Sequence, residues 1–311
     1  MIVAYLFPGQ GDQYLNMFDK FLNIDYLKEE FDLISNSIGL DINDIKDWGS
    51  EEFIFKNEIA QPLMVGYSVL LKRIFLDMGF YKPDLCLGYS VGEISANLFS
   101  ESISSQDALK ISVNRARFMN ASVCNENSQG LISIRGIGLR ELSDEVEKHE
   151  LFISIVNGID HFVVGGHNKN LKNIQDELEK NRGCKITKIN VNVASHTPLL
   201  KKSEDLLYQY LDNVEWKRTD VKVISGIDGR SVNSKEDFKV KFSKQVSSTI
   251  NWVTCIKRLI EQEVKMVVEI GPGKSMKNII LNNNLGVDVR SLNDFKSLIG
   301  FGDYMKRKIN K

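Results

Sequence analysis

The feature that most constrains the fold is a repeated order of short apolar run, glycine-rich turn and helix. Residues 1–7 form an uninterrupted apolar run that stops at Pro8-Gly9-Gln10-Gly11. A second apolar run, residues 85–87, stops at Gly88, and residues with helical apolar spacing precede and follow it. Short apolar runs bounded by glycine are typical of buried strands, and helices between such strands complete βαβ units. This order predicts an α/β fold with a mostly parallel sheet.

The middle third of the chain has a different order of elements. Strands are expected at about 130–134, 152–155, 162–164 and 184–192, and charged helices at about 140–149 and 171–180. Strand, helix, two strands, helix, strand is the ferredoxin-like order. We therefore expect a small ferredoxin-like subdomain at 125–193, inserted between two pieces of a larger α/β subdomain at 1–124 and 194–285. Residues 286–311 are expected to form a C-terminal tail with a solvated basic helix.

Charge and cysteine content exclude several classes of function. Lys and Arg total 40 and Asp and Glu total 41, so no basic field is available for nucleic acid or for an anionic membrane surface. No run reaches the ~18 consecutive apolar residues of a membrane span, and the first run lacks the basic segment of a signal peptide. The four cysteines form no CxxC pair. We therefore expect a cytoplasmic protein without a metal site.

Gly88-Tyr89-Ser90-Val91-Gly92 follows the G-x-S-x-G pattern between an expected strand and an expected helix. The two glycines permit a tight, strained turn that presents the serine hydroxyl at the helix N-terminus. In this position the pattern predicts the nucleophile elbow of a hydrolase-like α/β core, with Ser90 as the nucleophile. The alternative is a strand-to-helix turn that needs its glycines only for packing.

A serine nucleophile needs a base, and histidine is the usual one. His149 ends a helix rich in Glu and Lys, and His161 and His167 flank one expected strand, so a structural role explains all three. His196 lies in the loop where the chain returns to the larger subdomain. We predict that His196 is the base, and the alternative is a structural loop histidine.

Arg115 occupies an unusual place on its expected helix, at about 106–123. Ala108, Ile111, Phe118 and Met119 form an apolar arc at about 100° per residue, and Arg115 falls near its centre. A guanidinium that faces a core needs an anion to pair with. Arg115 is therefore either part of a buried ion pair or a clamp for a substrate carboxylate, which a guanidinium binds with two hydrogen bonds.

Two glycine-rich turns differ in what they can bind. Gly9-Gln10-Gly11 and the residue after the nucleophile, Val91, offer backbone N–H groups for an oxyanion. Gly271-Pro272-Gly273 lacks the spacing of a phosphate-binding P-loop, and no G-x-G-x-x-G fingerprint occurs in the chain. The sequence thus favours acyl chemistry over nucleotide or nicotinamide chemistry.

Taken together, these motifs resemble those of the malonyl-CoA:acyl-carrier-protein transacylases. This family includes the fatty-acid enzyme and the acyltransferases of polyketide synthases, built in or acting in trans. The matching segments follow the family order and are FPGQGDQ (7–13), AQPLM (60–64), GYSVGEISA (88–96), NRARFM (114–119), VNG…FVVGG (156–166), NVASHTPLL (192–200), SGIDGR (225–230), INW (250–252) and EIGPGKSM (269–276). The resemblance covers residues 3–280.

The resemblance implies a role for most of the candidate residues. Ser90 would be acylated, with His196 as general base and acid, and a backbone carbonyl from residues 247–251 would orient His196. The N–H groups of Gln10 and Val91 would form the oxyanion hole. Arg115 would pair with the free carboxylate of the malonyl group. Gln61 and Asn157 match positions that line the acyl pocket or steady nearby loops.

Two residues bear on the choice of acyl group. Tyr89 stands where the family usually has histidine, so the acyl pocket is expected to differ in shape. Ser195, before His196, accompanies methylmalonyl use in polyketide acyltransferases but malonyl use in fatty-acid enzymes, so it does not decide. Arg115 argues against a proofreading hydrolase, because those relatives generally lack this arginine.

The function implied is transfer of a malonyl group from malonyl-CoA to the phosphopantetheine thiol of an acyl carrier protein, for fatty-acid or polyketide synthesis. We expect ping-pong kinetics, no cofactor and a monomer. Carrier proteins of these pathways are acidic, and the basic candidates for contact are Lys201, Lys202, Lys241, Lys244 and residues 306–308. The alternatives are transfer of another acyl unit such as methylmalonyl, a proofreading thioester hydrolase, and a non-enzymatic docking subunit.

Overall fold

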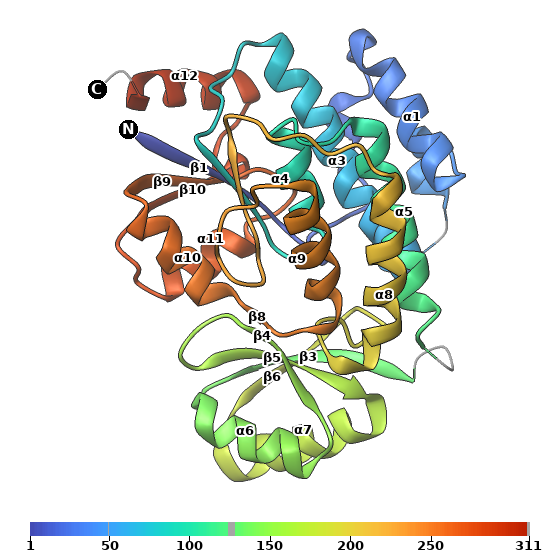
Figure 1. Cartoon of the computed structure of the whole chain (residues 1–311), viewed down its shortest axis with the longest axis vertical. Helices are drawn as coiled ribbons and strands as arrows, with labels where there is room; N and C mark the ends of the chain where they lie inside the picture. The colour runs from blue at the N-terminus through green and yellow to red at the C-terminus, as the bar shows by residue number, and fades with distance from the viewer. Residues whose placement is uncertain (49, 124–127, 310–311) are drawn as a thin grey trace.

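Two five-stranded sheets, each with its own helices, form the two parts of the molecule (Figure 1). The computed structural model describes residues 1–48, 50–123 and 128–309. Cys124 and the expected boundary between residues 124 and 125 lie outside these ranges. The two chain ends that are described lie near each other at one end of the molecule, far from the small subdomain.

The larger sheet is parallel throughout and has the strand order β10-β9-β1-β2-β7. Its strands are β1 (Ile2–Phe7), β2 (Leu85–Gly88), β7 (Lys222–Ile224), β9 (Val264–Glu269) and β10 (Asp288–Ser291). Phe7 lies opposite Gly88 in the register of β1 and β2. The two glycine-rich turns that follow these strands therefore leave the sheet side by side, at its carboxyl edge, where open α/β sheets bind their ligands.

Helices pack on both sides of this sheet. They are α1 (Lys28–Ile38), α2 (Glu51–Ile54), α3 (Asn57–Asp77), α4 (Gly92–Phe99), α5 (Ser105–Asn120), α8 (Lys201–Tyr210), α9 (Lys235–Ser247), α10 (Trp252–Glu261), α11 (Ser275–Asn282) and α12 (Leu298–Ile309). α4 packs on β1 and β2, whereas α10 and α11 pack on β9. α3 is long and apolar enough to cross a membrane, but 83% of its most apolar window is buried inside this protein, as in a core helix.

The small subdomain has the ferredoxin-like order that the sequence predicts. Its elements are β3 (Gln129–Arg135), α6 (Leu139–Lys148), β4 (Phe152–Val156), β5 (His161–His167), α7 (Asn168–Arg182) and β6 (Lys185–Ile189). The strands pair antiparallel in the order β6-β3-β5-β4. α6 and α7 cover the outer face, so the sheet lies between these helices and the larger subdomain (Figure 1).

A fifth strand of the small sheet comes from the larger subdomain. β8 (Ile250–Asn251) follows α9 and pairs parallel with β4. Thr249 Oγ1 also donates a hydrogen bond to Ile153 O, 2.7 Å away. The sequence did not indicate this strand, because two residues are too few to show an alternating pattern. The insertion is thus anchored by sheet pairing as well as by its two chain connections.

The C-terminal residues differ from the expected solvated tail. β10 is the edge strand of the larger sheet, and the side chains of Phe301 and Met305 on α12 are buried. The Phe301 ring stacks on Phe75 of α3, with 5.7 Å between ring centroids. Apolar residues four apart give α12 a narrow buried stripe beside its basic residues, so residues 288–309 belong to the larger subdomain.

Candidate active site

The turn after β2 has the strained geometry of a nucleophile elbow. Ser90 has φ of 55°, in the left-handed region that costs energy for any residue with a side chain. A Cβ on Gly88 would collide with the backbone of Gly92 and Glu93, and a Cβ on Gly92 would collide with Phe7 O. Both glycines of G-x-S-x-G are therefore required by close backbone approach, which places Ser90 above the carboxyl edge of the sheet.

His196 lies within hydrogen-bonding distance of this serine. Ser90 Oγ and His196 Nε2 are 2.8 Å apart, and His196 Nδ1 is 2.6 Å from Gln245 O. Because a backbone carbonyl can only accept, Nδ1 carries the proton and Nε2 is free to accept the serine proton. The orienting carbonyl comes from Gln245 at the end of α9, so the expectation of residues 247–251 is wrong by two positions.

The environment of His196 keeps its imidazole neutral. The residue is 1% exposed and has φ of 61°, a second strained backbone in the same site. Burial and the nearby Arg115 charge lower the pKa of His196 to about 3, against the opposing effect of the hydrogen bond to Gln245. A neutral imidazole at physiological pH is the form that can take a proton from the serine.

Arg115 is buried on α5 and its guanidinium reaches the same point. Its Nη1 donates to Gln61 Oε1 at 2.7 Å, and its Nη2 lies 3.3 Å from Ser90 Oγ. The side chain is 1% exposed, and its Nε has no hydrogen-bond partner within the described part of the chain. Burial lowers the pKa of Arg115 to about 10, so the group remains charged at neutral pH. The guanidinium is thus a cation next to the nucleophile that, within the described residues, still has an N–H group, on Nε, free to donate a hydrogen bond.

Gln61 and Asn57 fix the arginine from behind. Gln61 Nε2 donates to Asn57 Oδ1 at 2.7 Å, and Asn57 Nδ2 donates to Ala116 O on α5 at 3.2 Å. Gln61 therefore presents its oxygen to Arg115, because its amide nitrogen is already engaged. The structure places Gln61 behind Arg115, away from the pocket lining, which fits the steadying alternative of the two roles that the resemblance implied.

Tyr89 connects the elbow to the small subdomain. Its hydroxyl donates to Asn157 Oδ1 at 3.2 Å, and its ring packs edge-on against Trp252, with centroids 4.9 Å apart. Asn157 O in turn accepts from Asn283 Nδ2 at 2.7 Å. A Cβ on Gly9 would meet Tyr89 O at 2.9 Å, so the turn after β1 touches the elbow directly. Tyr89 thus forms one wall of the site and Asn157 stands behind it.

A small pocket of about 70 Å³ opens above Ser90 between the two subdomains. The predicted residues that line it are Gln10, Tyr89, Ser90, Arg115, Ser195 and His196. The small sheet contributes Leu131, Ile155 and Val163, which are apolar. Val91 is the N-cap of α4, next to Ser90, so its N–H lies at the start of this helix. Gln61 and Asn157 contact the lining residues without forming part of the wall.

The comparisons with known proteins show the family of the chain. The model of the acyl transferase domain family matches residues 4–285. The chain belongs to the acyl transferase domain family. Among curated relatives, the malonyl CoA-acyl carrier protein transacylase of Bacillus subtilis (strain 168) is 27% identical over 298 residues, covering 94% of this chain and 93% of that protein. The enzyme of the same name from Buchnera aphidicola is 24% identical over 300 residues, covering 95% of this chain and 96% of that protein.

Solved structures show the same fold over the whole length. A malonyl-transacylase in complex with its type II polyketide synthase acyl-carrier protein superposes with a TM-score of 0.90, at 24% identity over 98% of this chain and 100% of that chain. The malonyl-CoA:acyl carrier protein transacylase of Xanthomonas oryzae gives a TM-score of 0.89, at 22% identity over 99% of each chain. The expected α/β fold with an inserted small subdomain is confirmed.

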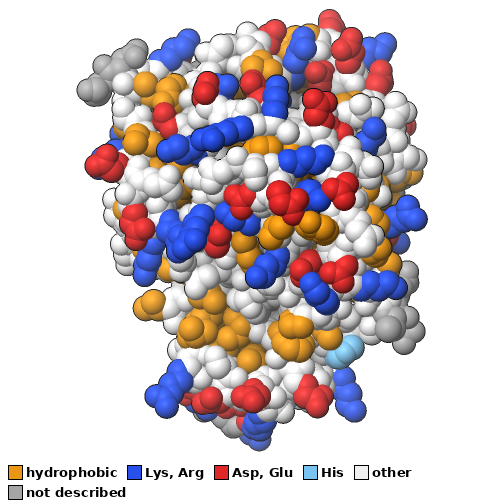
Figure 2. All heavy atoms as spheres, viewed as in Figure 1, with side chains coloured by type: hydrophobic (Ala, Val, Ile, Leu, Met, Phe, Trp, Pro, Cys, Tyr) orange, Lys and Arg blue, Asp and Glu red, His pale blue; other side chains and the backbone are white. Residues whose placement is uncertain are grey.

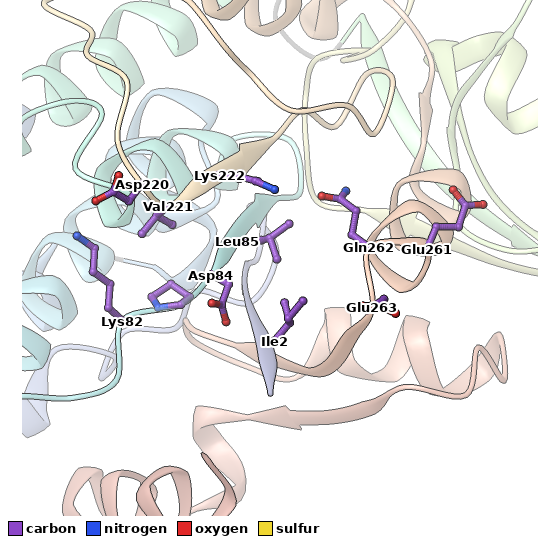
Figure 3. Close-up of a pocket in the computed structure, with 11 residues that line it drawn as sticks. Ile2, Lys82, Asp84, Leu85, Asp220, Val221, Lys222, Glu261, Gln262 and Glu263 are labelled. Carbon is purple, nitrogen blue, oxygen red and sulfur yellow. The ribbon is translucent and has the colours of Figure 1, made fainter. Parts of the chain in front are cut away.

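A much larger hollow lies at the opposite edge of the same sheet of this acyl transferase domain. It has about 730 Å³ and is formed where β1, β2 and β7 begin, with Lys82, Asp84, Asp220 and Lys222 among its residues (Figure 3). Asp84 Oδ2 accepts from Val3 N at 2.8 Å and from the Tyr81 hydroxyl at 3.1 Å. The Asp84 carboxylate is therefore already hydrogen-bonded near the first residues of β1 and β2. The larger volume reflects an open surface depression without a nucleophile.

Two of the other histidines, His149 and His161, have structural partners, and the third, His167, is exposed at the end of β5. His149 Nε2 lies 3.0 Å from Glu177 Oε2 between α6 and α7, where Glu145 also lies close enough to share a cation. Lys148 Nζ already occupies this place, 2.5 Å from Glu177 Oε1. His161 Nε2 lies 3.0 Å from Ser133 Oγ across the small sheet, and burial lowers the pKa of His161 to about 4. Neither His149 nor His161 lines the pocket above Ser90.

Lys and Arg side chains do not form a patch of one sign on the face seen in Figure 2. On the face seen in Figure 2, Lys and Arg are interspersed with Asp and Glu over the larger subdomain. Lys201 pairs with Glu204 at 2.6 Å, and Lys241 pairs with Asp237 at 3.1 Å. Lys202 and Lys244 are exposed. Local charge pairing agrees with the balanced composition of the chain.

Two functional candidates were missed by reading the sequence. Gln245 contacts both His196 and Arg115, and Glu93 accepts a hydrogen bond from Gln245 Nε2 at 2.6 Å. Glu93 lies within the GYSVGEISA segment, three residues after the nucleophile, and this spacing could have indicated it. Gln245 shares a helix face with Phe238, Phe242 and Val246 on α9, and a polar residue in that apolar stripe was the signal.

Proposed function

We propose that this chain transfers a malonyl group from malonyl-CoA to the phosphopantetheine thiol of an acyl carrier protein, through an ester on Ser90. The observation that carries the proposal is the convergence of His196 Nε2 and Arg115 Nη2 on Ser90 Oγ, at 2.8 and 3.3 Å. The first contact provides a base, and the second provides a fixed cation for the free carboxylate of a malonyl group.

In the first half-reaction the Ser90 hydroxyl gives its proton to His196 Nε2 while its oxygen attacks the thioester carbonyl carbon. The N–H groups of Gln10 and Val91 stabilise the negative charge that develops on the carbonyl oxygen. The carbon–sulfur bond breaks, and the protonated His196 returns its proton to the CoA sulfur. A malonyl-serine ester and free CoA are the products.

In the second half-reaction the thiol of the carrier protein attacks this ester. His196 takes the thiol proton and then gives it to Ser90 Oγ as the ester bond breaks. Because CoA leaves before the carrier protein reacts, the kinetics are ping-pong. The thioester carbonyl is reactive enough to acylate Ser90 and His196 moves the protons, so the transfer needs no bound cofactor. Arg115 binds the free carboxylate that malonyl and methylmalonyl groups share, so the choice between them rests on the shape of the wall that Tyr89 and Ser195 help to form.

The setting of the reaction is proposed on the same basis. The curated relatives carry the name malonyl CoA-acyl carrier protein transacylase, and one similar structure is a complex with a polyketide acyl-carrier protein. We therefore assign the chain to fatty-acid or polyketide synthesis, and we propose that it acts in the cytoplasm as a monomer. Exposed Lys202 and Lys244 are the lysines that we expect to meet an acidic carrier protein.

The test is the intact mass of the protein after mixing with malonyl-, methylmalonyl- or acetyl-CoA, followed by addition of a phosphopantetheinylated carrier protein. Malonyl-CoA should give an adduct that moves to the carrier protein, and Ser90→Ala should give none. Ser95→Ala is the matched control, because Ser95 is a buried serine of α4 outside the site. An adduct that persists in Ser90→Ala, or release of free malonate faster than transfer, would contradict the proposal.

A further inference from the structure

Glu93 is a buried acid beside the site that the reaction does not use. It is 0% exposed on α4, in the first turn after the nucleophile elbow. Its Oε2 accepts from Gly226 N at 3.0 Å and from Gln245 Nε2 at 2.6 Å. Its Oε1 is buried and has no hydrogen-bond partner in the part of the chain that the structure describes. Burying a carboxylate that has one hydrogen-bonded oxygen and one oxygen without a partner costs free energy, unless a nearby opposite charge offsets that cost.

The Gln245 amide links this acid to the arginine of the site. Its Nε2 donates to Glu93, and its Oε1 faces Arg115 Nη2 at 3.5 Å. One amide group therefore stands between a buried cation and a buried anion, with its dipole aligned to both. The same residue orients His196 through its backbone oxygen.

The charges around Glu93 come from each element packed against it. Arg115 on α5 is the cation, and Asp228, in the loop after β7, adds a like charge. The Cys255 thiol on α10 also faces Glu93, and burial raises its pKa to about 12, so it stays neutral. Burial raises the pKa of Glu93 to about 7, and the Gly226 N–H, the Ser225 hydroxyl and Arg115 oppose that rise. Glu93 is thus the acid placed to balance Arg115 while the pocket is empty.

We propose that Glu93 is the resident counter-charge of Arg115, and that arrival of a malonyl carboxylate at Arg115 makes Glu93 take up one proton from solvent. This inference rests on the proposed function. A second anion near Arg115 disfavours the ionised form of Glu93, because like charges in one buried site do not both ionise readily. By linkage, malonyl binding weakens as the pH rises through the pKa of Glu93.

Protonation changes the charge without changing the hydrogen bonds. Oε2 accepts from Gly226 and Gln245 in either state, and the proton goes to Oε1. Glu93→Gln imitates the protonated state, because its amide oxygen can accept the same two N–H groups while its charge is gone. Acetyl groups carry no carboxylate, so acetyl loading is independent of the charge on Glu93.

The first measurement is proton uptake by the wild-type protein during a single round of loading, in weak buffer with an indicator dye at pH 7.5. Exchange of a thioester for an ester plus a thiol releases no proton by itself at this pH. Malonyl-CoA should therefore give uptake of a fraction of one proton per acylated chain, and acetyl-CoA should give none. Equal uptake with both substrates, or none with malonyl-CoA while the Ser90 adduct forms, would overturn the inference and leave the proposed function standing.

The second measurement is the KM for loading between pH 6 and 8.5. In the wild-type protein the KM for malonyl-CoA should rise roughly fivefold or more, the lower end of usual coupling between sites, with a flat KM for acetyl-CoA. Glu93→Gln should flatten the malonyl profile. Glu269→Gln is the matched control, since Glu269 is equally buried with a pKa raised to about 7, but it caps α11 at Met276 and Lys277. A malonyl profile that persists in Glu93→Gln, or that flattens in Glu269→Gln, would contradict the inference. Failure of malonyl to load at all would overturn both proposals.

Discussion

Each of the two edges of the larger sheet has a hollow, and the smaller hollow is the one that contains the reactive side chains. The pocket at the carboxyl edge has about 70 Å³ and contains a buried arginine, a neutral histidine and a serine in strained backbone. The hollow at the amino edge has about 730 Å³ and is lined by charges that solvent reaches or that hold strand starts. Volume alone would select the wrong edge.

The difference arises from the direction of the strands. At the carboxyl edge, each strand feeds a glycine-rich turn and then a helix N-terminus, so backbone N–H groups and side chains converge there. At the amino edge, the strands begin after loops and helix C-termini, so the helices that precede these strands do not point their backbone N–H groups toward this edge. The small subdomain adds to this asymmetry, because it covers the carboxyl edge and excludes water from it. Charges buried there interact strongly, whereas those at the amino edge are screened.

The largest effect is expected from His196→Ala. Removal of the base should lower acyl loading by a factor of roughly 10²–10⁴, the usual contribution of a general base. In the wild-type protein, the lowered pKa of His196 keeps the imidazole neutral above about pH 3. The rate of acetyl loading should therefore not fall as the pH is lowered through 6.5, where an ordinary histidine would be protonated. Stopped-flow loading with acetyl-CoA measures both, and a fall centred near 6.5 would contradict the neutral environment assigned to His196.

A smaller and more selective effect is expected from Arg115→Ala. Loss of a charged hydrogen-bond donor costs about 1.5–3 kcal/mol, so malonyl loading should fall by roughly 10- to 150-fold while acetyl loading changes far less. Arg115→Lys keeps the charge but not the two-pronged geometry, and should recover part of the loss. The ratio of kcat/KM for malonyl-CoA to that for acetyl-CoA is the readout. An equal fall with both substrates would show that Arg115 serves only to build the site.

The nucleophile elbow and the base could be predicted from the sequence, because each is marked by a short segment of neighbouring residues. Gly88 is required by close contact with the backbone of Gly92 and Glu93, a few residues away, whereas the contact that requires Gly92 is with Phe7 at the end of β1. The ferredoxin-like order was readable for the same reason, since strand and helix periods are local. The predicted strand at 184–192 nevertheless ends at Ile189, because the chain must turn toward the larger subdomain before His196.

Long-range partners could not be read in the same way. The contact between Gln245 and His196 spans 49 residues, and that between Gln245 and Glu93 spans 152. An acid in the first turn of a helix is ordinarily explained by the helix dipole, so the spacing of Glu93 from Ser90 could mark it as a candidate but could not identify Gln245 as its partner. β8 is recognisable as a strand only once β4 lies beside it. The sequence thus defined the reacting groups better than the residues that orient them.

The smallest effect is expected at the amino edge. Lys222 is exposed and lines the larger hollow, and its backbone N–H, not its side chain, bonds to Asp84 O. Lys222→Ala should change the free energy of unfolding by no more than about 0.5 kcal/mol, as exposed substitutions do. Malonyl loading should stay within about twofold, because solvent screens this charge from Ser90 at the other edge of the sheet. Chemical denaturation and single-turnover loading check the two quantities. A loss of malonyl loading comparable to that of Arg115→Ala would break the contrast between the two edges and place part of the acyl-CoA site in the larger hollow.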